Sequence, residues 1–233
     1  MINIFKNGMV EDCQIKNLDI IYNEYFKDKT NGFFVEVGAF DGVSFSNTTP
    51  LVNCGWKGIY LEPVKEYFDR LQKNLGNNKN LTLLQYAISD IEEEQTINVM
   101  NTLTTLNNNM VDIYKNISWA IPSVNILKKE NVLCKKLTTV LDENSVIKYF
   151  DVLVIDVEGY ELNVLKSLDF NKYLPKLIII ELEDSHEDFQ TNECVELINN
   201  IKECRGILEY NNYKLIYCDC INSIYKLDDK LYK

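Results

Sequence analysis

The sequence is poor in the residues that build zinc sites, linkers and membrane spans. It has 233 residues with one histidine, His186, and none of its seven cysteines forms a C-x-x-C pair, so structural zinc is not expected. No internal repeat or low-complexity segment divides the chain. Its longest apolar runs, such as residues 177–180, are far shorter than the roughly 20 residues of a membrane helix. These absences favour a single globular domain without a membrane span.

Positive charge is also scarce. The chain has 24 Lys and Arg against 35 Asp and Glu, a formal net charge of -11, which disfavours a nucleic-acid partner because phosphate backbones would be repelled. No apolar segment typical of a secretory signal is visible near the N-terminus, and the cysteines are odd in number and irregularly spaced. Together these features predict a cytoplasmic protein with free, buried thiols. Cys218 and Cys220 are expected to share one face of a strand. The oligomeric state is left open.

Apolar runs alternate with helical patterns along most of the chain. Short apolar runs predict strands at residues 33–37, 57–61, 81–88, 95–100, 132–136, 151–156 and 176–182. Helical spacing predicts helices between them, at residues 43–53, 64–75, 138–144, 160–168 and around 194–201. Strands that alternate with helices in units of about 25–30 residues predict βαβ crossovers. We therefore expect an α/β fold with a mostly parallel sheet and helices on both faces.

Both ends of the chain depart from this pattern. Residues 11–28 have helical spacing, so we divide the chain into a helical lead-in over residues 1–30 and one domain over residues 31–233. Near the C-terminus, residues 206–210 and 214–218 flank a short turn with two asparagines and predict a β-hairpin. This hairpin would add an antiparallel edge to the sheet.

Ligands of such sheets bind at the carboxyl ends of the strands, near the point where strand order reverses. The first strand end reads EVGAFDG over residues 36–42, and its glycines allow a ligand to approach the backbone closely. Glu36 and Asp41 would oppose a phosphate there, but they suit the amino group and sulfonium of S-adenosylmethionine (SAM). The spacing is not the G-x-G-x-x-G of dinucleotide sites, and a Gly-x-x-x-Gly turn alone is common.

Glu62 and Pro63 end the second strand. Glu62 lies 24 residues after Gly38, near the position where an acidic residue binds ribose hydroxyls in Rossmann-like sites. The alternative role is structural, because a carboxylate at a helix N-terminus with Pro63 in the first turn stabilises that helix by a few tenths to about 1 kcal/mol. Both roles are compatible.

Two further strand ends carry carboxylates. Asp156 and Glu158 follow the run DVLVI, and their like charges would raise at least one pKa unless a cation lies between them. Their alternative role is to cap the following helix. Glu181 and His186 follow the run KLIII. Histidine is the usual general base for a hydroxyl nucleophile, although a lone histidine in an acidic loop is commonly a solvated bystander.

These strand ends lie within segments that resemble one protein family. The segments are FFVEVGAFDGVSFSNT, IYLEPVKEYFDRLQKN, QYAISD, LTTVLDE, FDVLVIDVEGYELNVLKSL and PKLIIIELE. They resemble the FkbM family of SAM-dependent methyltransferases over about residues 32–183, and VGAFDG and DVEGYE are the most specific of them. The resemblance implies a Rossmann-like class I methyltransferase fold with a seven-stranded sheet.

The resemblance also implies roles for individual residues. It implies SAM binding by residues of the first two strand ends and of the segment beside the adenine, namely Glu36, Gly38, Ala39, Asp41, Gly42, Ser46, Asn47, Glu62, Pro63, Ala87 and Ile88. It implies that Asp156 and Glu158 line the reaction chamber. Many class I enzymes have an acidic residue by the adenine, where this chain has Gln85 and Ser89, so adenine recognition departs from that pattern.

The implied reaction is O-methylation, because family members mostly methylate hydroxyls of sugars, polyketides and related small molecules. The partner would then be a small-molecule or glycan acceptor. Our hypothesis is that Asp156, Glu158 or His186 accepts the hydroxyl proton. A divalent metal ion on Asp156, Glu158 and Glu181 is a second way to acidify the hydroxyl, although no metal is expected.

Residues 101–130, rich in asparagine and containing Trp119, are predicted to form a lid over the acceptor. Two other functions stay open. An RNA ribose 2'-O-methyltransferase would need a basic groove and a lysine beside Asp156, and the segment VIDVEGYE has none. A catalytically silent SAM-fold module for binding or scaffolding would keep the sheet but lose the cofactor contacts. A nicotinamide oxidoreductase is disfavoured by the missing glycine fingerprint.

Overall fold

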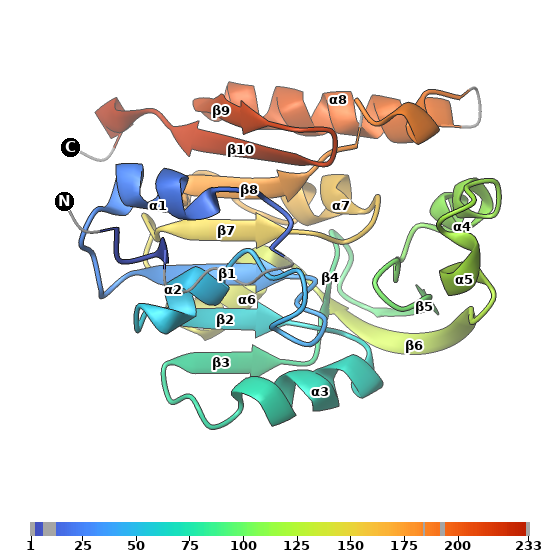
Figure 1. Cartoon of the computed structure of the whole chain (residues 1–233), viewed down its shortest axis with the longest axis horizontal. Helices are drawn as coiled ribbons and strands as arrows, with labels where there is room; N and C mark the ends of the chain where they lie inside the picture. The colour runs from blue at the N-terminus through green and yellow to red at the C-terminus, as the bar shows by residue number, and fades with distance from the viewer. Residues whose placement is uncertain (1–2, 7–12, 184, 192–193, 232–233) are drawn as a thin grey trace.

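The computed structural model describes residues 3–6, 13–183, 185–191 and 194–231. Its centre is a seven-stranded sheet in the order β3-β2-β1-β7-β8-β10-β9 (Figure 1). The strands are β1 (Phe33–Val37), β2 (Lys57–Leu61), β3 (Leu81–Leu84), β7 (Val152–Ile155), β8 (Leu177–Glu181), β9 (Tyr213–Cys218) and β10 (Asn222–Leu227). The first five pair in parallel, and β10 is antiparallel to both β8 and β9. The predicted α/β fold, with its mostly parallel seven-stranded sheet and antiparallel hairpin, is confirmed.

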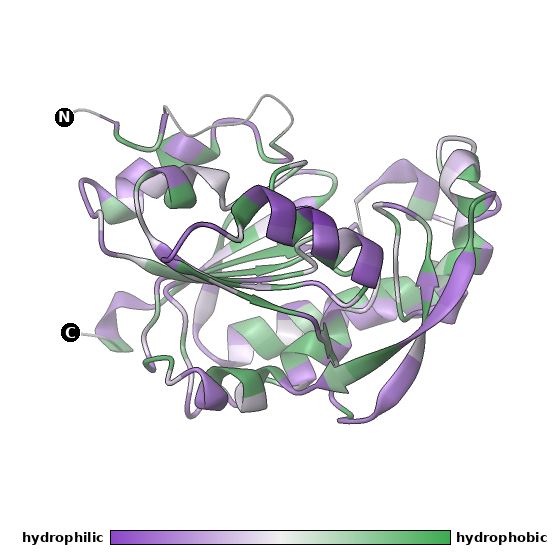
Figure 2. Ribbon diagram, turned by 90° about the horizontal axis from the view of Figure 1, so that it is seen from below, coloured by the Kyte–Doolittle hydropathy of each residue, from purple (hydrophilic) through white to green (hydrophobic). Residues whose placement is uncertain are grey.

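Helices cover both faces of this sheet, as predicted (Figure 2). One face packs against α1 (Leu18–Phe26), α2 (Thr49–Asn53) and α3 (Lys65–Leu75), and the other against α6 (Leu137–Glu143), α7 (Glu161–Lys166) and α8 (Val195–Tyr210). Strand residues alternate between the two layers: Phe34 packs with the first group of helices, Val35 and Val37 with the second. Burial on both faces explains why these strands are continuous apolar runs in the sequence.

The strand order reverses between β1 and β7, which are neighbours at the centre of the sheet. From β1 the chain continues to β2 and β3 on one side, and from β7 it continues to β8 on the other. The loops that follow β1 and β7 therefore diverge, which leaves a crevice at the carboxyl ends of these strands. Of the predicted site residues, Gly38 and Asp156 come directly after these two strands.

A second sheet, which was not predicted, extends beyond the carboxyl ends of the main strands (Figure 1). It contains β4 (Ala87–Ile88), β5 (Glu94–Val99) and β6 (Lys128–Lys135), with α4 (Asn108–Tyr114) and α5 (Ile121–Val124) beside it. The single strand predicted for residues 81–88 is therefore wrong. The chain leaves the main sheet after Leu84, and Ala87 pairs with Cys134 of β6. Ala87 and Ile88 remain buried, so the apolar character continues across the break.

The hairpin begins later in the chain than predicted. Residues 206–210 form the end of α8 instead of a strand, because Ile201, Cys204 and Leu208 continue one buried helical stripe. Gly206 does not interrupt the helix, and a Cβ at this position would meet no atom within 4 Å. The hairpin is formed by β9 and β10.

The prediction that the cysteine thiols are buried is correct for only some of the seven cysteines. Cys134, Cys194 and Cys204 are buried, whereas Cys218 and Cys220 are exposed. The prediction that Cys218 and Cys220 share a strand face is wrong, because β9 ends at Cys218 and Cys220 lies in the hairpin turn.

Two predicted helices are shorter in the structure. The lead-in helix is α1, which begins at Leu18, and residues 11 and 12 of the predicted range lie outside the described residues. Of the predicted helix over residues 43–53, only α2 is helical, since the preceding residues form turns. Within the described parts of the chain, no helix combines the length and the apolar character needed to cross a membrane.

Candidate active site

A pocket opens at the carboxyl ends of β1, β2 and β7. Most of the predicted cofactor and catalytic residues line it, namely Glu36, Gly38, Ala39, Ser46, Asn47, Glu62, Pro63, Ala87, Ile88, Asp156 and Glu158. The second sheet and the segment after β5 contribute Ile97, Thr102 and Leu106. The fold thus gathers residues that are widely separated in the sequence.

Gly38 holds the turn after β1 between the neighbouring strands. Its φ of 87° lies in the region that favours glycine, and an added Cβ would lie 1.7 Å from the backbone oxygen of Asp156. On the other side, the N–H groups of Gly38 and Ala39 both donate to the carbonyl of Leu61, at 3.0 Å each. This turn therefore needs glycine because the backbone after β1 lies directly against the backbone after β7.

Glu36 is a buried carboxylate on β1. The Thr48 hydroxyl donates a hydrogen bond to it, and Thr48 also shares a hydrogen bond of 2.7 Å with the Tyr60 hydroxyl. Burial raises the pKa of Glu36 to about 8, even though the Thr48 hydrogen bond lowers it in part. A cation in the pocket would favour the ionised form.

Glu62 is also buried, and its two oxygens are both used. Oε2 accepts the N–H of Phe40 at 2.9 Å, and Oε1 accepts the N–H of Val64 at 2.8 Å. These bonds fix the carboxylate between the turn after β1 and the start of α3. Burial raises the pKa of Glu62 to about 8 against the lowering effect of the two N–H groups. Each oxygen keeps a lone pair, so the group can still accept hydroxyl hydrogen bonds from a ligand.

Asp41 and Gly42 do not contribute to the described pocket wall. The Asp41 carboxylate accepts the N–H groups of Val43 and Ser44, at 2.9 and 2.7 Å, and the hydroxyl of Ser44 at 2.9 Å. Gly42 has a φ of 76° and faces leucine side chains of α3. Both residues shape the turn that carries the pocket, and their contact with a cofactor remains a prediction.

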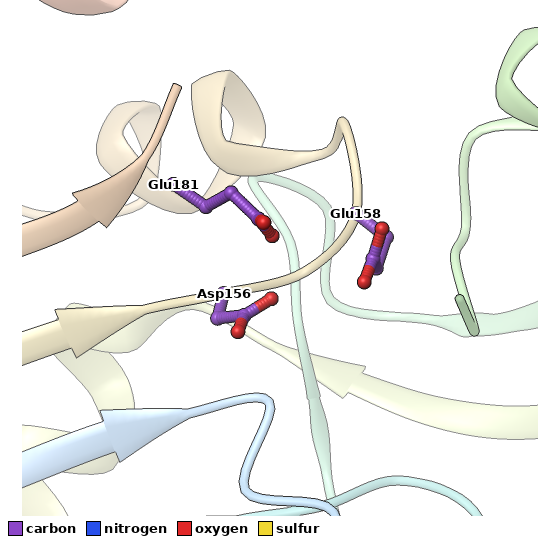
Figure 3. Close-up of side chains that lie close together, drawn as sticks. All are labelled: Asp156, Glu158 and Glu181. Atoms are coloured by element: carbon purple, nitrogen blue, oxygen red, sulfur yellow. The ribbon is translucent and has the colours of Figure 1, made fainter. Parts of the chain in front are cut away.

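Asp156, Glu158 and Glu181 form an acidic cluster where β7 and β8 end (Figure 3). One carboxylate oxygen from each residue lies within 4.8 Å of the others. Burial raises the pKa of both Glu158 and Glu181 well above the usual value, and the nearby charge of Asp156 raises both further. Glu158 also has a φ of 56°, an uncommon and strained conformation for a residue with a Cβ.

The three carboxylates of this cluster differ in their partners. Gln14 donates its side-chain amide to Asp156 at 2.9 Å, and the Tyr114 hydroxyl donates to Glu158. Glu181 has a buried Oε2 for which the described part of the chain supplies no hydrogen-bond partner. Only Asp156 and Glu158 reach the pocket wall, and Asp156 is the more exposed of the two.

Gln14 is a pocket residue that sequence reasoning missed. Its side-chain carbonyl accepts the amide of Asn47 at 3.0 Å, while its amide donates to Asp156. Gln14 therefore connects the segment before α1 to the loop between β1 and α2 and to the end of β7. A polar residue in a lead-in segment belongs to no motif, so nothing in the sequence indicates this role.

His186 lies outside the described pocket wall. Its Nδ1 accepts the backbone N–H of Asp188 at 3.3 Å, and its ring packs against Trp119 and Phe189. The Trp119 indole donates to Asp188 at 2.7 Å. His186 and Trp119 thus belong to one aromatic group beside α5, and the structure does not bring either to the predicted chamber.

Part of the predicted lid does reach the pocket. The contributing residues are Asn101, Thr102, Thr104, Thr105 and Leu106, all from the segment between β5 and α4. Tyr67 also lines the pocket, with its ring centroid 4.7 Å from that of Phe40. Its place on the apolar face of a helix predicts a core residue, which explains why it was not selected from the sequence.

The comparisons with known proteins agree with this arrangement. The model of the Methyltransferase FkbM domain matches residues 36–215, which is most of the chain. No curated protein sequence matches.

Solved structures resemble the fold at low sequence identity. A presumed O-methyltransferase from Klebsiella pneumoniae has a TM-score of 0.50 and 12% identity, over 97% of this chain and 86% of that one. An O-methyltransferase from Bacillus cereus in complex with SAH has a TM-score of 0.49 and 11% identity, over 96% and 86%. Fibrillarin from Aeropyrum pernix with natively bound SAM has a TM-score of 0.45 and 9% identity, over 85% and 66%. At such identities, only the Klebsiella structure supports an inference, and it concerns the Rossmann-like fold alone.

Proposed function

The chain belongs to the FkbM family of SAM-dependent methyltransferases, and from this premise we propose that it methylates a hydroxyl group of a sugar, a glycan or a related small molecule. The proposal assigns the pocket at the ends of β1, β2 and β7 to SAM and to the reacting hydroxyl.

The charge of the pocket is the observation that carries the proposal. Among the described residues that line it, four are carboxylates and none is Lys, Arg or His; the carboxylates are Glu36, Glu62, Asp156 and Glu158. SAM has a sulfonium and an ammonium group against one carboxylate, so such a wall attracts it. A nicotinamide dinucleotide or an RNA backbone would instead bring phosphates next to these carboxylates.

The pocket residues fit the parts of SAM. Glu62, fixed by two backbone N–H groups, is oriented to accept the ribose hydroxyls. Glu36 and Asn47 lie on the wall where the methionine end, with its ammonium group, would bind. Apolar Ala87 and Ile88 suit the adenine ring. Gly38 lies on the pocket wall, where its positive φ and the close approach of the Asp156 backbone require glycine.

Bound SAM supplies a methyl group on a positively charged sulfur. The acceptor oxygen forms a bond to the methyl carbon, the carbon–sulfur bond breaks with its electron pair left on sulfur, and the hydroxyl loses its proton. In our proposal Asp156 or Glu158 accepts that proton, because both lie on the pocket wall. Asp156 is the first choice, since Glu158 is more buried and already accepts the Tyr114 hydroxyl. His186 is assigned no role in the transfer.

The segment between β5 and α4 is the proposed acceptor side. Asn101, Thr102, Thr104 and Thr105 place amide and hydroxyl groups on the pocket wall, and such groups can exchange hydrogen bonds with sugar hydroxyls. Tyr160 adds an aromatic side chain on which a sugar ring can pack.

Transfer of a radioactive methyl group from labelled SAM tests this proposal. We expect incorporation into at least one neutral acceptor from a panel of mono- and oligosaccharides, in an ether linkage that resists mild alkali. Asp156→Asn should slow the transfer by about 100-fold or more, the range of general-base contributions. The exposed Asp112→Asn on α4 serves as the control and should leave the rate unchanged. Incorporation only into amines or RNA would contradict the proposal.

A further inference from the structure

Glu181 is an unusual end to a central strand. It is the last residue of β8, it is 7% exposed, and its Oε2 has no hydrogen-bond partner among the described residues. Its side chain points towards Asp156, with Glu158 on the other side of the group (Figure 3). A buried carboxylate oxygen without a partner costs free energy, so its position here calls for a ligand that the protein itself does not supply.

The surroundings of Asp156, Glu158 and Glu181 increase the free-energy cost of burying these carboxylates. The described ion pairs contain no Lys, Arg or His that pairs with Asp156, Glu158 or Glu181. The neutral donors nearby, the Gln14 amide and the Tyr114 hydroxyl, bind only Asp156 and Glu158. Three carboxylates this close repel one another unless a positive charge or a proton lies between them.

We propose that Asp156, Glu158 and Glu181 bind one divalent cation of the hard, oxygen-preferring class. Two ligands of one ion lie no further apart than twice the metal–oxygen distance. For Ca²⁺, with bonds of about 2.3–2.6 Å, this limit is about 4.6–5.2 Å. The three oxygens, within 4.8 Å of one another, meet this limit. For Mg²⁺, with bonds of about 2.0–2.1 Å, the limit is about 4.0–4.2 Å.

Such an ion would also assist the proposed methyl transfer by activating the acceptor hydroxyl. This part of the inference rests on the proposed function. Three protein ligands leave about three or more of the six to eight coordination positions for water or for an acceptor oxygen. Because Asp156 and Glu158 lie on the pocket wall, these positions are accessible from the pocket. The ion lowers the pKa of a coordinated hydroxyl, so the proton can leave to water. Asp156 and Glu158 would then act as ligands instead of proton acceptors.

A proton shared between Glu181 and Asp156 is the competing explanation for the cluster. Both explanations remove the repulsion, but only the ion adds a binding site. Calorimetric titration of the metal-free chain with MnCl₂, MgCl₂ and CaCl₂, without SAM, separates them. We expect one ion per chain with a Kd of about 10⁻⁴ M or tighter for at least one of the three metals.

Two matched variants locate the site. Glu181→Gln keeps the shape of the side chain but removes the unpartnered ligand, and should weaken metal binding by at least about 30-fold. Glu183→Gln removes an equally buried charge two residues further on, outside the three-oxygen group, and should weaken it by less than about 5-fold. Circular dichroism should show both variants folded. A wild-type chain that binds none of the three metals, or equal losses in the two variants, would overturn the proposal.

A separate titration with SAM in EDTA keeps this result distinct from the proposed function. SAM binding in EDTA together with metal binding that depends on Glu181 supports both proposals. Metal binding without SAM binding sustains the ion site and contradicts the methyltransferase reading of the pocket. SAM binding without metal binding supports the methyltransferase function and contradicts the ion site.

Discussion

The acidic groups at the two sides of the pocket differ in how their carboxylates are satisfied. At the ends of β1 and β2, Glu36 accepts the Thr48 hydroxyl, and Glu62 accepts two backbone N–H groups. At the ends of β7 and β8, the described residues supply one neutral donor each to Asp156 and Glu158, and none to a buried oxygen of Glu181. Burial raises the pKa of Glu36 and Glu62 on one side and of Glu158 and Glu181 on the other.

Burial therefore does not separate the two groups. The difference lies at Glu181, which has a buried oxygen without a donor among the described residues and lies close to two further carboxylates. A carboxylate held by fixed donors has a defined orientation and spare lone pairs, which suits the hydroxyls and the ammonium of a cofactor. A carboxylate without donors, among like charges, requires a cation or a proton. This difference is the reason for assigning one side of the pocket to SAM and the other to an ion and the acceptor.

The largest effect is expected at Gly38, where the backbone after β1 lies directly against the backbone after β7. Gly38→Ala would place a Cβ 1.7 Å from the backbone oxygen of Asp156 at a φ of 87°. We expect the free energy of unfolding to fall by about 3 kcal/mol or more, measured by urea denaturation. Gly206→Ala is the matched control, because its Cβ would meet no atom and the substitution should stabilise α8 by about 0.5–1 kcal/mol. Equal effects in the two variants would contradict this account of the turn.

Glu62→Gln tests the cofactor side directly. The amide can accept only one of the two N–H bonds from Phe40 and Val64, and it loses the negative charge. SAM affinity should fall about 10- to 100-fold in a calorimetric titration. Glu66→Gln, on the exposed surface of α3, should change it less than twofold. An unchanged affinity in the Glu62 variant would place the ribose elsewhere.

Substitution of Glu36 should have a smaller effect on stability than Gly38→Ala, and at high pH it should raise stability instead of lowering it. Its pKa of about 8 in the folded chain lies above the ordinary value of 4.5, so the folded state binds the proton more tightly than the unfolded state. The contribution of Glu36 to stability is therefore full below about pH 4.5 and is lost as the pH rises through 8. In EDTA and without SAM, Glu36→Gln should flatten the fall in Tm between pH 6 and 9 and raise Tm at pH 8.5 by a few degrees. The same variant should bind SAM more weakly, whereas a parallel fall in Tm for both proteins would contradict the assignment.

The smallest effect is expected at His186. Its side chain accepts one backbone N–H and packs on Trp119 and Phe189, away from the described pocket wall. His186→Gln should change the Kd for SAM less than twofold and the Tm by less than about 3 °C. A loss of methyl transfer comparable to that of Asp156→Asn would instead identify His186 as the proton acceptor.

Much of the main sheet could be predicted because its strands are buried on both faces. Runs such as VLVI in β7 are continuous, short and rich in β-branched residues, which favours a buried strand. Strands were predicted at residues 95–100 and 132–136, which overlap β5 and the end of β6, but the sequence does not indicate that they pair with each other in a separate sheet. The end of α8 was mistaken for a strand because a glycine and a β-branched residue stand where the helix continues.

The candidate site could be predicted where it follows a strand, as Glu36, Glu62 and Asp156 do. It could not be predicted at Gln14, which belongs to no motif, or at Tyr67, whose place on the apolar face of α3 predicts a core residue. The sequence could suggest that Glu181 joins Asp156 and Glu158, since their strands are adjacent. Only the structure shows that one Glu181 oxygen is buried and has no hydrogen-bond partner in the part of the chain that is described.

The central claim is that the carboxylate-lined pocket binds SAM, and calorimetric titration of the intact chain with SAM tests it most directly. The account predicts one molecule of SAM per chain with a micromolar Kd, and similar binding of the demethylated product. It predicts no heat of binding with a nicotinamide dinucleotide under the same conditions. Absence of SAM binding by a folded chain, or preferential binding of the dinucleotide, would contradict it.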